Sequence, residues 1–154
     1  YMKFLITAFL FLAWTFSVQA QFLQTQDEFG QEKSLQEYFA ANPNNRNKSI
    51  IYVFYNNNGC YECPQAMAML EQIYQAQYAD LYGFFMIDYQ NDEEYDFISR
   101  YQLSQPLEVV LLRIQDGAVF GYQKIENLQN MTSDTVSFKN YVTEQINSFL
   151  GHNG

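Results

Sequence analysis

Two cysteines, the only ones in this chain, stand two residues apart in the segment Gly59-Cys60-Tyr61-Glu62-Cys63-Pro64. An apolar run typical of a buried strand, residues 50–55, comes just before the pair, and a stretch with helical spacing follows it. A cysteine at the start of a helix lies near unpaired backbone N–H groups and the positive end of the helix dipole, and both favour the reactive thiolate. The sequence therefore predicts a redox-active pair on a strand–helix unit, with Cys60 at the exposed start of the helix and Cys63 one turn inside, closer to the core.

Two other interpretations of the pair have to be weighed. Zinc requires four ligands, and this chain offers no third cysteine and a single histidine, His152, in its C-terminal Gly-His-Asn-Gly segment. We therefore expect no metal site and no cofactor. The stronger alternative is a purely structural disulfide between Cys60 and Cys63. A ring this short restrains little of the unfolded chain, so it would add little stability, and redox chemistry is the better interpretation.

The N-terminal residues have the pattern of an export signal. Lys3 precedes an apolar stretch from Phe4 to Phe16, and small residues lead to a cleavage position after Ala20. We expect residues 1–20 to be removed as a signal peptide, which leaves no stable membrane insertion and makes the protein periplasmic or secreted. Disulfides persist in such compartments. The alternative is an uncleaved N-terminal segment that anchors the chain at a membrane.

The charge of the chain limits its partners. Its 17 acidic and 8 basic residues give a formal net charge of −9, which becomes −10 when the signal leaves with Lys3. Nucleic-acid phosphates are bound by clustered Lys and Arg, so a chain this acidic is unsuited to them. We therefore expect no nucleic-acid partner.

One domain is expected over residues 34–150, after a polar lead-in over 21–33 and before a short tail over 151–154. Ser34 with Glu37, and later Asn91 with Glu94, have the spacing of a capping box at a helix start. The expected elements are a helix at 34–42, a strand at 49–55, a helix with Pro64 in its first turn, a buried strand at 83–88, a helix through Phe97 and Tyr101, strands at 107–114 and 118–125, and a helix from Asp134 to Leu150.

This order of elements predicts an α/β fold. Strands that alternate with helices form right-handed crossovers and parallel pairs, whereas Gln115-Asp116-Gly117 marks a hairpin that adds an antiparallel pair. We expect a central mixed β-sheet flanked by helices.

The chain resembles the thioredoxin-like superfamily over roughly residues 34 to 150. Three segments carry the resemblance: Val53-Phe54-Tyr55 before the Cys-Tyr-Glu-Cys motif, Met86-Ile87-Asp88 before a helix, and Pro106 before a strand and an Asp-Gly turn. The resemblance implies a thioredoxin-like fold that exchanges disulfides with protein thiols. It implies that Cys60 is the nucleophile and Cys63 the resolving cysteine. It also implies that Tyr61, Glu62 and Pro106 face the substrate, with Pro106 as the candidate cis-proline.

Several residues depart from the family pattern. Gly59 stands where thioredoxins usually have tryptophan, Tyr61-Glu62 replaces Gly-Pro, and Pro64 replaces a basic residue. Phe54, six residues before Cys60, stands where the family keeps a buried aspartate that assists proton transfer. The departures leave two functions open. The chain is an exported thiol–disulfide oxidoreductase, or it is a non-catalytic binding or assembly module of thioredoxin fold with a structural disulfide.

Overall fold

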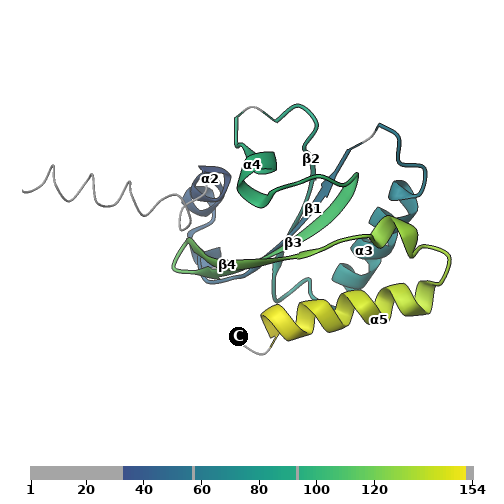
Figure 1. Cartoon of the computed structure of the whole chain (residues 1–154). Coiled ribbons are helices and arrows are strands. Elements are labelled where there is room, and N and C mark those ends of the chain that lie inside the picture. Colours follow the sequence, from purple (N-terminus) through teal and green to yellow (C-terminus); the bar gives the residue numbers. More distant parts are fainter. Residues whose placement is uncertain (1–32, 57, 93, 152–154) are drawn as a thin grey trace, which may run out of the picture.

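Four strands form one mixed sheet with helices on both faces (Figure 1). The structure is a computed structural model that describes residues 33–56, 58–92 and 94–151. The expected signal peptide, the lead-in up to residue 32 and residues 152–154 of the tail lie outside the described residues. The elements are α2 (Lys33–Ala41), η1 (Pro43–Asn45), β1 (Ile50–Tyr55), α3 (Cys63–Gln77), β2 (Gly83–Asp88), α4 (Phe97–Tyr101), β3 (Leu107–Gln115), β4 (Ala118–Ile125), η2 (Leu128–Asn130), α5 (Thr135–Ile146) and η3 (Asn147–Gly151).

The strand order of the sheet is β2-β1-β3-β4. β1 runs parallel to β2, and α3 connects the two strands. β1 runs antiparallel to β3, which forms a hairpin with β4. The predicted mixed sheet flanked by helices is therefore confirmed.

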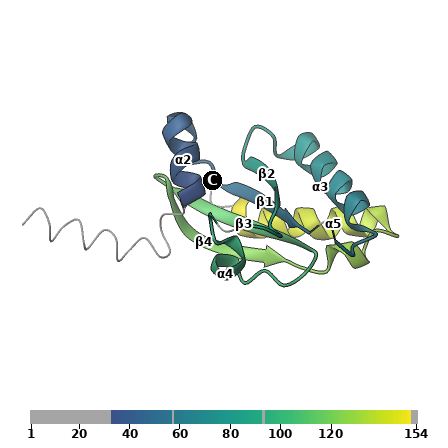
Figure 2. The same ribbon diagram turned by 90° about the horizontal axis from the view of Figure 1, so that it is seen from above.

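The two faces of the sheet carry two separate apolar cores, because successive side chains of a strand point to opposite faces. One core lies between the sheet and the helices α3 and α5, and the other lies under α2 and α4 (Figures 1 and 2). In β1, Ile51 and Val53 belong to the α3/α5 core, whereas Tyr52 and Phe54 belong to the α2/α4 core. The residues of β1 from Ile50 to Phe54 are all buried, which explains why the segment is apolar without alternation.

The β3–β4 hairpin turns through Asp116 and Gly117, whose φ angles are 54° and 81°. Positive φ at both turn residues is the geometry that an Asp-Gly pair adopts readily. The Arg46 carbonyl accepts a hydrogen bond from the Gly117 N–H at 2.8 Å, so the turn is tied to the loop after η1. Further along β4, Phe120 is an extra residue, because Val119 pairs with Ile114 while Gly121 pairs with Arg113.

Both predicted capping boxes are wrong. Ser34 lies inside α2, and its hydroxyl pairs with the Tyr52 hydroxyl at 3.2 Å. The Glu37 carboxylate accepts a hydrogen bond from the Tyr95 hydroxyl at 2.8 Å instead of returning to its own helix. Before α4, Glu94 pairs with Lys33 at 3.5 Å. Long-range partners have displaced the local caps in both places.

Asp92 organises the chain before α4 in place of Asn91 and Glu94. Its two carboxylate oxygens accept the backbone N–H groups of Tyr95 at 2.9 Å and Phe97 at 3.1 Å. The helix that follows has only 5 residues.

Two further expectations need correction. The strand β2 is half-buried rather than buried, because it is an edge strand with β1 as its only neighbour. Asp134 is the N-cap of the last helix, as its predicted place at the helix start requires, and its carboxylate accepts the Ser137 N–H at 3.0 Å and the Ser137 hydroxyl at 2.8 Å. These two hydrogen bonds lower the pKa of Asp134. The regular part of this helix ends at Ile146, and a π-helical segment over Asn147–Gly151 continues to Gly151.

Candidate functional site

The cysteine pair lies at the connection between β1 and α3. Cys60 is in the loop between them, Cys63 is the first residue of α3, and a disulfide joins the two with their Cα atoms 5.4 Å apart. Gly59 bends the loop with a φ of 83°, a conformation that glycine adopts without strain. Pro64 lies in the first turn of α3, where a missing N–H breaks no helical hydrogen bond. The local sequence therefore explains why the disulfide forms at the helix start.

The helix start differs by one turn from the sequence expectation. We expected Cys60 at the exposed start and Cys63 one turn inside, but Cys60 lies three residues before the helix. The first helical hydrogen bond runs from the Ala66 N–H to the Glu62 carbonyl at 3.1 Å. The positive end of the helix dipole therefore lies at Glu62 and Cys63, next to the disulfide.

The two cysteine residues are unequally exposed, in the order that the sequence predicts. Cys63 is buried, with 4% of its surface exposed, and belongs to the α3/α5 core. Cys60 is partly buried and packs against the same core. Between them Tyr61 is 94% exposed, and Glu62 is exposed as well. Of the two linked residues, Cys60 is therefore the more exposed.

Phe54 and Cys63 lie on opposite faces of the sheet. Phe54 is fully buried in the α2/α4 core, whereas Cys63 belongs to the α3/α5 core. The neighbouring strand residues that share the core of the cysteines are Val53 and Tyr55. The residue type at position 54 therefore has no direct contact through which to act on Cys63.

Pro106 is brought beside the cysteine loop, but its peptide bond is trans. Among the described residues no peptide bond is cis, so the cis assignment of Pro106 is corrected. Trans is the preferred state of most X–Pro bonds. The Pro106 carbonyl accepts the Asn56 N–H at 2.9 Å, which continues the β1–β3 ladder beyond Tyr55 and Leu107. Pro106 therefore lies beside the start of the loop that carries Cys60.

A buried carboxylate, Glu108, holds the segment that leads to Pro106. Its side chain is fully buried, and one oxygen accepts the backbone N–H groups of Ser104 at 2.8 Å and Gln105 at 3.3 Å. The other oxygen pairs with the Lys124 ammonium at 3.2 Å. Lys124 also donates to the Gln102 carbonyl at 2.9 Å. Glu108 and Lys124 thus fix this segment from the face of the sheet opposite the cysteines.

Electrostatics keep Lys124 charged in this network. Partial burial on its own would lower the pKa of Lys124, but the hydrogen bond to Glu108 and the charges of Glu108 and Glu126 outweigh it and raise the pKa. The Lys124 ammonium lies 3.6 Å from Glu126. A charged lysine is therefore a stable partner for the buried carboxylate.

The sequence analysis missed Gln105, Tyr89 and Lys124. All four polar groups of Gln105 are engaged: its N–H with Glu108, its carbonyl with the Tyr89 hydroxyl, its side-chain amide with Glu126 at 3.1 Å, and its side-chain oxygen with the Asn127 N–H at 3.0 Å. The available signal was the position of Gln105 directly before Pro106.

Among the described residues, no group of three or more His, Cys, Asp and Glu side chains is placed to hold a metal ion. None of the helices in that part of the chain has the length and apolar character needed to cross a membrane.

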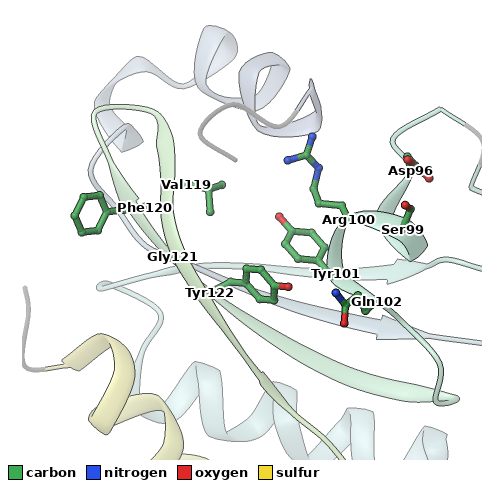
Figure 3. Close-up of a pocket in the computed structure, with 9 residues that line it drawn as sticks. All are labelled: Asp96, Ser99, Arg100, Tyr101, Gln102, Val119, Phe120, Gly121 and Tyr122. Atoms are coloured by element: carbon green, nitrogen blue, oxygen red, sulfur yellow. The ribbon is translucent and has the colours of Figure 1, made fainter. Parts of the chain in front are cut away.

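A pocket of about 510 Å³ lies away from the cysteines, between α4 and β4 (Figure 3). The rings of Tyr101 and Tyr122 meet edge to face in it, with centroids 5.1 Å apart. Arg100 extends along its rim in Figure 3. None of the predicted site residues lines this pocket, so it is separate from the cysteine site.

No protein-family model matches the chain, and no curated protein matches it by sequence. Among solved structures, it is similar to the germline-specific thioredoxin Deadhead of Drosophila melanogaster, with 18% identity and a TM-score of 0.49 over 74% of this chain and 96% of that one. It is also similar to chloroplastic thioredoxin z, with 13% identity and a TM-score of 0.42 over 69% of this chain and 91% of that one.

The assignment of the fold rests on the molecule's own topology. A parallel β1–α3–β2 crossover, a helix, an antiparallel β3–β4 hairpin and a final helix follow in the predicted order. The cysteine pair stands between the first strand of the sheet and the helix that follows it. The chain therefore has a thioredoxin-like fold with a disulfide of Cys-x-x-Cys spacing at the start of α3.

Proposed function

We propose that this chain is an exported thiol–disulfide oxidoreductase that exchanges disulfides with protein partners through Cys60 and Cys63. The observation that supports it best is the unequal exposure of the two linked cysteines. Cys63 is 4% exposed, whereas Cys60 is partly exposed and flanked by the open side chains of Tyr61 and Glu62. A disulfide between a partly exposed and a buried cysteine suits a reaction that begins at one cysteine and ends at the other.

The exchange proceeds in two balanced steps. The Cys60 thiolate attacks a partner disulfide, forms a mixed disulfide and releases the partner's other sulfur as a thiolate. The Cys63 thiolate then attacks the Cys60 sulfur, closes the Cys60–Cys63 bond and releases the second partner sulfur as a thiolate, which takes up a proton from water. The partner gains two electrons and the chain loses two. The reverse sequence oxidises a partner dithiol.

The surroundings of the pair have separate roles in this proposal. The dipole of α3 favours the thiolate form of a cysteine near its N-terminal end, where Cys63 begins the helix and Cys60 lies three residues before it. The exposed ring of Tyr61 offers a partner a large contact surface without a cost in buried polar groups. Glu62 places a negative charge at the helix start, which opposes the thiolate. Pro106 lies opposite the cysteine loop, and its carbonyl accepts the hydrogen bond from the Asn56 N–H.

The alternative function is a binding or assembly module with a structural disulfide. One observation favours it: in the described part of the chain, Glu108 is the only buried carboxylate, and it faces the core opposite Cys63. The α3/α5 core therefore supplies no buried carboxylate to take a proton from Cys63.

The variant Cys63→Ser separates the two functions. Without a resolving thiol, Cys60 should remain in mixed disulfides with partners, because release needs a second nearby sulfur. The variant is expressed with its N-terminal segment, quenched with acid and run on non-reducing gels. Reducible adducts of high mass are expected.

Two matched variants control this trapping experiment. Cys60→Ser keeps the buried Cys63 and should give few adducts, and Cys60→Ser/Cys63→Ser should give none. If Cys63→Ser folds normally and yields no adducts, the oxidoreductase is excluded in favour of the module.

Export is tested separately by the intact mass of protein recovered outside the cytoplasm. We expect a mass that lacks residues 1–20, and with them Trp14, the only tryptophan of the chain. Tyrosine-only fluorescence would agree with this cleavage. Protein that retains Trp14 would favour the membrane-anchored alternative.

A further inference from the structure

The Asn58-Gly59 pair in the cysteine loop has the chemistry of a self-modifying site. Asparagine followed by glycine is the sequence in which the backbone nitrogen of the next residue reaches the side-chain amide most easily, because glycine has no Cβ in the way. The chain contains two such pairs, Asn58-Gly59 and Asn153-Gly154. The second pair lies outside the described residues. The first stands immediately before Cys60.

The surroundings of this pair leave room for the reaction. Both residues are exposed, and a Cβ placed on Gly59 would meet no described atom within 4 Å apart from those of its two chain neighbours. Within residues 33–56, 58–92 and 94–151, the Asn58 side-chain amide and the Gly59 N–H have no hydrogen-bond partner. The Asn58 N–H alone is held, by the Asn56 side-chain oxygen at 2.9 Å. None of these described residues therefore holds either of the two groups that must react.

Other asparagines of the described chain lack this combination. Asn42 precedes Pro43, which has no N–H to attack with. The Asn47 side-chain oxygen accepts the Asp116 N–H at 2.8 Å, and the side chain of Asn147 accepts the Tyr78 hydroxyl at 2.8 Å. Asn130 is exposed but precedes the bulkier Met131. Asparagine is a thermolabile residue in general, and among the described asparagines Asn58 alone is followed by glycine.

We propose that Asn58 is a site of spontaneous deamidation, and that the carboxylate formed there lowers the reactivity of Cys60. The Gly59 nitrogen attacks the Asn58 side-chain carbonyl carbon, a C–N bond forms in a five-membered imide, and the side-chain nitrogen leaves as ammonia. Water then opens the imide at either carbonyl, which gives aspartate or isoaspartate. No electrons are transferred, and water is the only co-reactant.

The consequence for Cys60 rests on the proposed function. A new negative charge two residues before Cys60 disfavours its thiolate, as does the charge of Glu62 on the other side. Because the loop is exposed, solvent screens the charge, and the thiolate population should fall by about two- to threefold. An isoaspartate would in addition lengthen the backbone of the loop by one carbon. The disulfide site would therefore lose activity as the protein ages.

The first test follows the modification itself. The full chain is incubated near neutral pH in water enriched in heavy oxygen, then digested and mapped by mass spectrometry. We expect heavy-oxygen incorporation at Asn58 many times faster than at Asn47 or Asn130 in the same sample, and none at position 58 in Asn58→Gln. If Asn58 deamidates no faster than Asn47 and Asn130, it is not a preferred deamidation site and the proposal fails.

The second test measures the consequence with the reduced protein. Asn58→Asp should slow alkylation of Cys60 by about two- to threefold relative to Asn58→Gln, with Cys63 alkylation unchanged. Equal or faster alkylation of Cys60 in Asn58→Asp overturns the effect on the thiolate. Neither measurement needs a partner protein. Failure here is therefore distinct from failure of the oxidoreductase, which appears only as missing adducts in the Cys63→Ser experiment.

Discussion

Two loops meet at the cysteine end of the sheet, and the fold holds them in opposite ways. The segment from Gln102 to Pro106 is fixed by the buried carboxylate of Glu108, by Lys124 and by the Tyr89 hydroxyl. The described residues of the cysteine loop, from Asn56 to Glu62, make backbone hydrogen bonds mainly at Asn56 and at the helix start. The disulfide is the principal further restraint on that loop.

This difference assigns separate tasks to the two loops. The polar groups of Gln105 are all hydrogen-bonded inside the protein, so we expect the segment before Pro106 to keep its shape when the disulfide opens. The cysteine loop presents Tyr61 and Glu62 to solvent and has to change when the disulfide opens. In the proposed exchange, the segment before Pro106 would be a rigid support beside the loop that reacts, and scaffolds commonly position functional groups in this way.

The largest expected effect tests the rigid loop. Glu108→Ala removes the acceptor of the Ser104 and Gln105 N–H groups and leaves Lys124 without its buried partner. Breaking a buried ion pair typically costs about 3 to 5 kcal/mol, and the partial exposure of Lys124 favours about 3 kcal/mol here. Chemical denaturation monitored by circular dichroism measures the free energy of unfolding.

Two variants control this measurement. Glu108→Gln keeps an acceptor for the backbone N–H groups and should cost less than Glu108→Ala. Glu62→Ala removes an exposed carboxylate from the cysteine loop and should change the stability by no more than about 0.5 kcal/mol. A similar loss for Glu62→Ala and Glu108→Ala would contradict the contrast between the loops.

The pairing of Glu108 with Lys124 could not be predicted from the sequence, and the reason is a single extra residue. In β3 and β4, Gln115 pairs with Ala118 next to the turn. If the pairing continued from there without an extra residue, Lys124 would lie opposite Val109, on the α3/α5 face. The insertion of Phe120 shifts Lys124 opposite Val110, on the face of Glu108. A one-residue shift moves every later side chain to the other face. Gly121 was the available signal, because glycine inside a strand often marks a bulge.

Much of the scaffold was predictable, because local patterns and the sheet agree there. The apolar runs, the Asp-Gly turn and the helical spacing after Pro64 gave the strand and helix order that the structure has. The helix caps failed at Ser34 and Glu37, since both side chains found partners far along the chain. The exposure order of Cys60 and Cys63 was predictable from their order along the chain. The hydrogen bonds that fix Gln105 and Glu108 were not, because they depend on contacts between distant segments.

The second expected effect tests the restraint on the cysteine loop. Cys60→Ser/Cys63→Ser removes the disulfide, and a ring this short should contribute about 2 kcal/mol or less. Reduction of the unmodified protein should cost the same amount, measured by denaturation with and without a reductant. If the free energy of unfolding falls more than it does in Glu108→Ala, the disulfide, and not the buried ion pair, is the main support of this end of the sheet.

A smaller effect comes from the Tyr89 hydroxyl. Tyr89 is 7% exposed, and its hydroxyl donates to the Gln105 carbonyl. Tyr89→Phe keeps the ring in its core and removes this hydrogen bond, so the unfolding free energy should fall by about 1 kcal/mol. Tyr61→Phe is the matched control, because Tyr61 is 94% exposed and the same change there should leave the stability unaltered.

The smallest effect is the dependence of the Tyr89 contribution on pH. Burial raises the pKa of Tyr89 above its usual value of 10.0, and the charges of Glu108 and Asp88 add to the rise. The unfolded chain loses the Tyr89 proton near its ordinary pKa while the folded protein keeps it, so the stability from Tyr89 is complete below pH 10 and declines above it. The difference in unfolding free energy between the unmodified protein and Tyr89→Phe should therefore shrink between neutral pH and pH values above the ordinary tyrosine pKa. Other tyrosines titrate in both proteins, so only this difference is informative. If this difference in unfolding free energy stays constant or grows with pH, the folded protein does not keep the Tyr89 hydroxyl protonated at the Gln105 carbonyl.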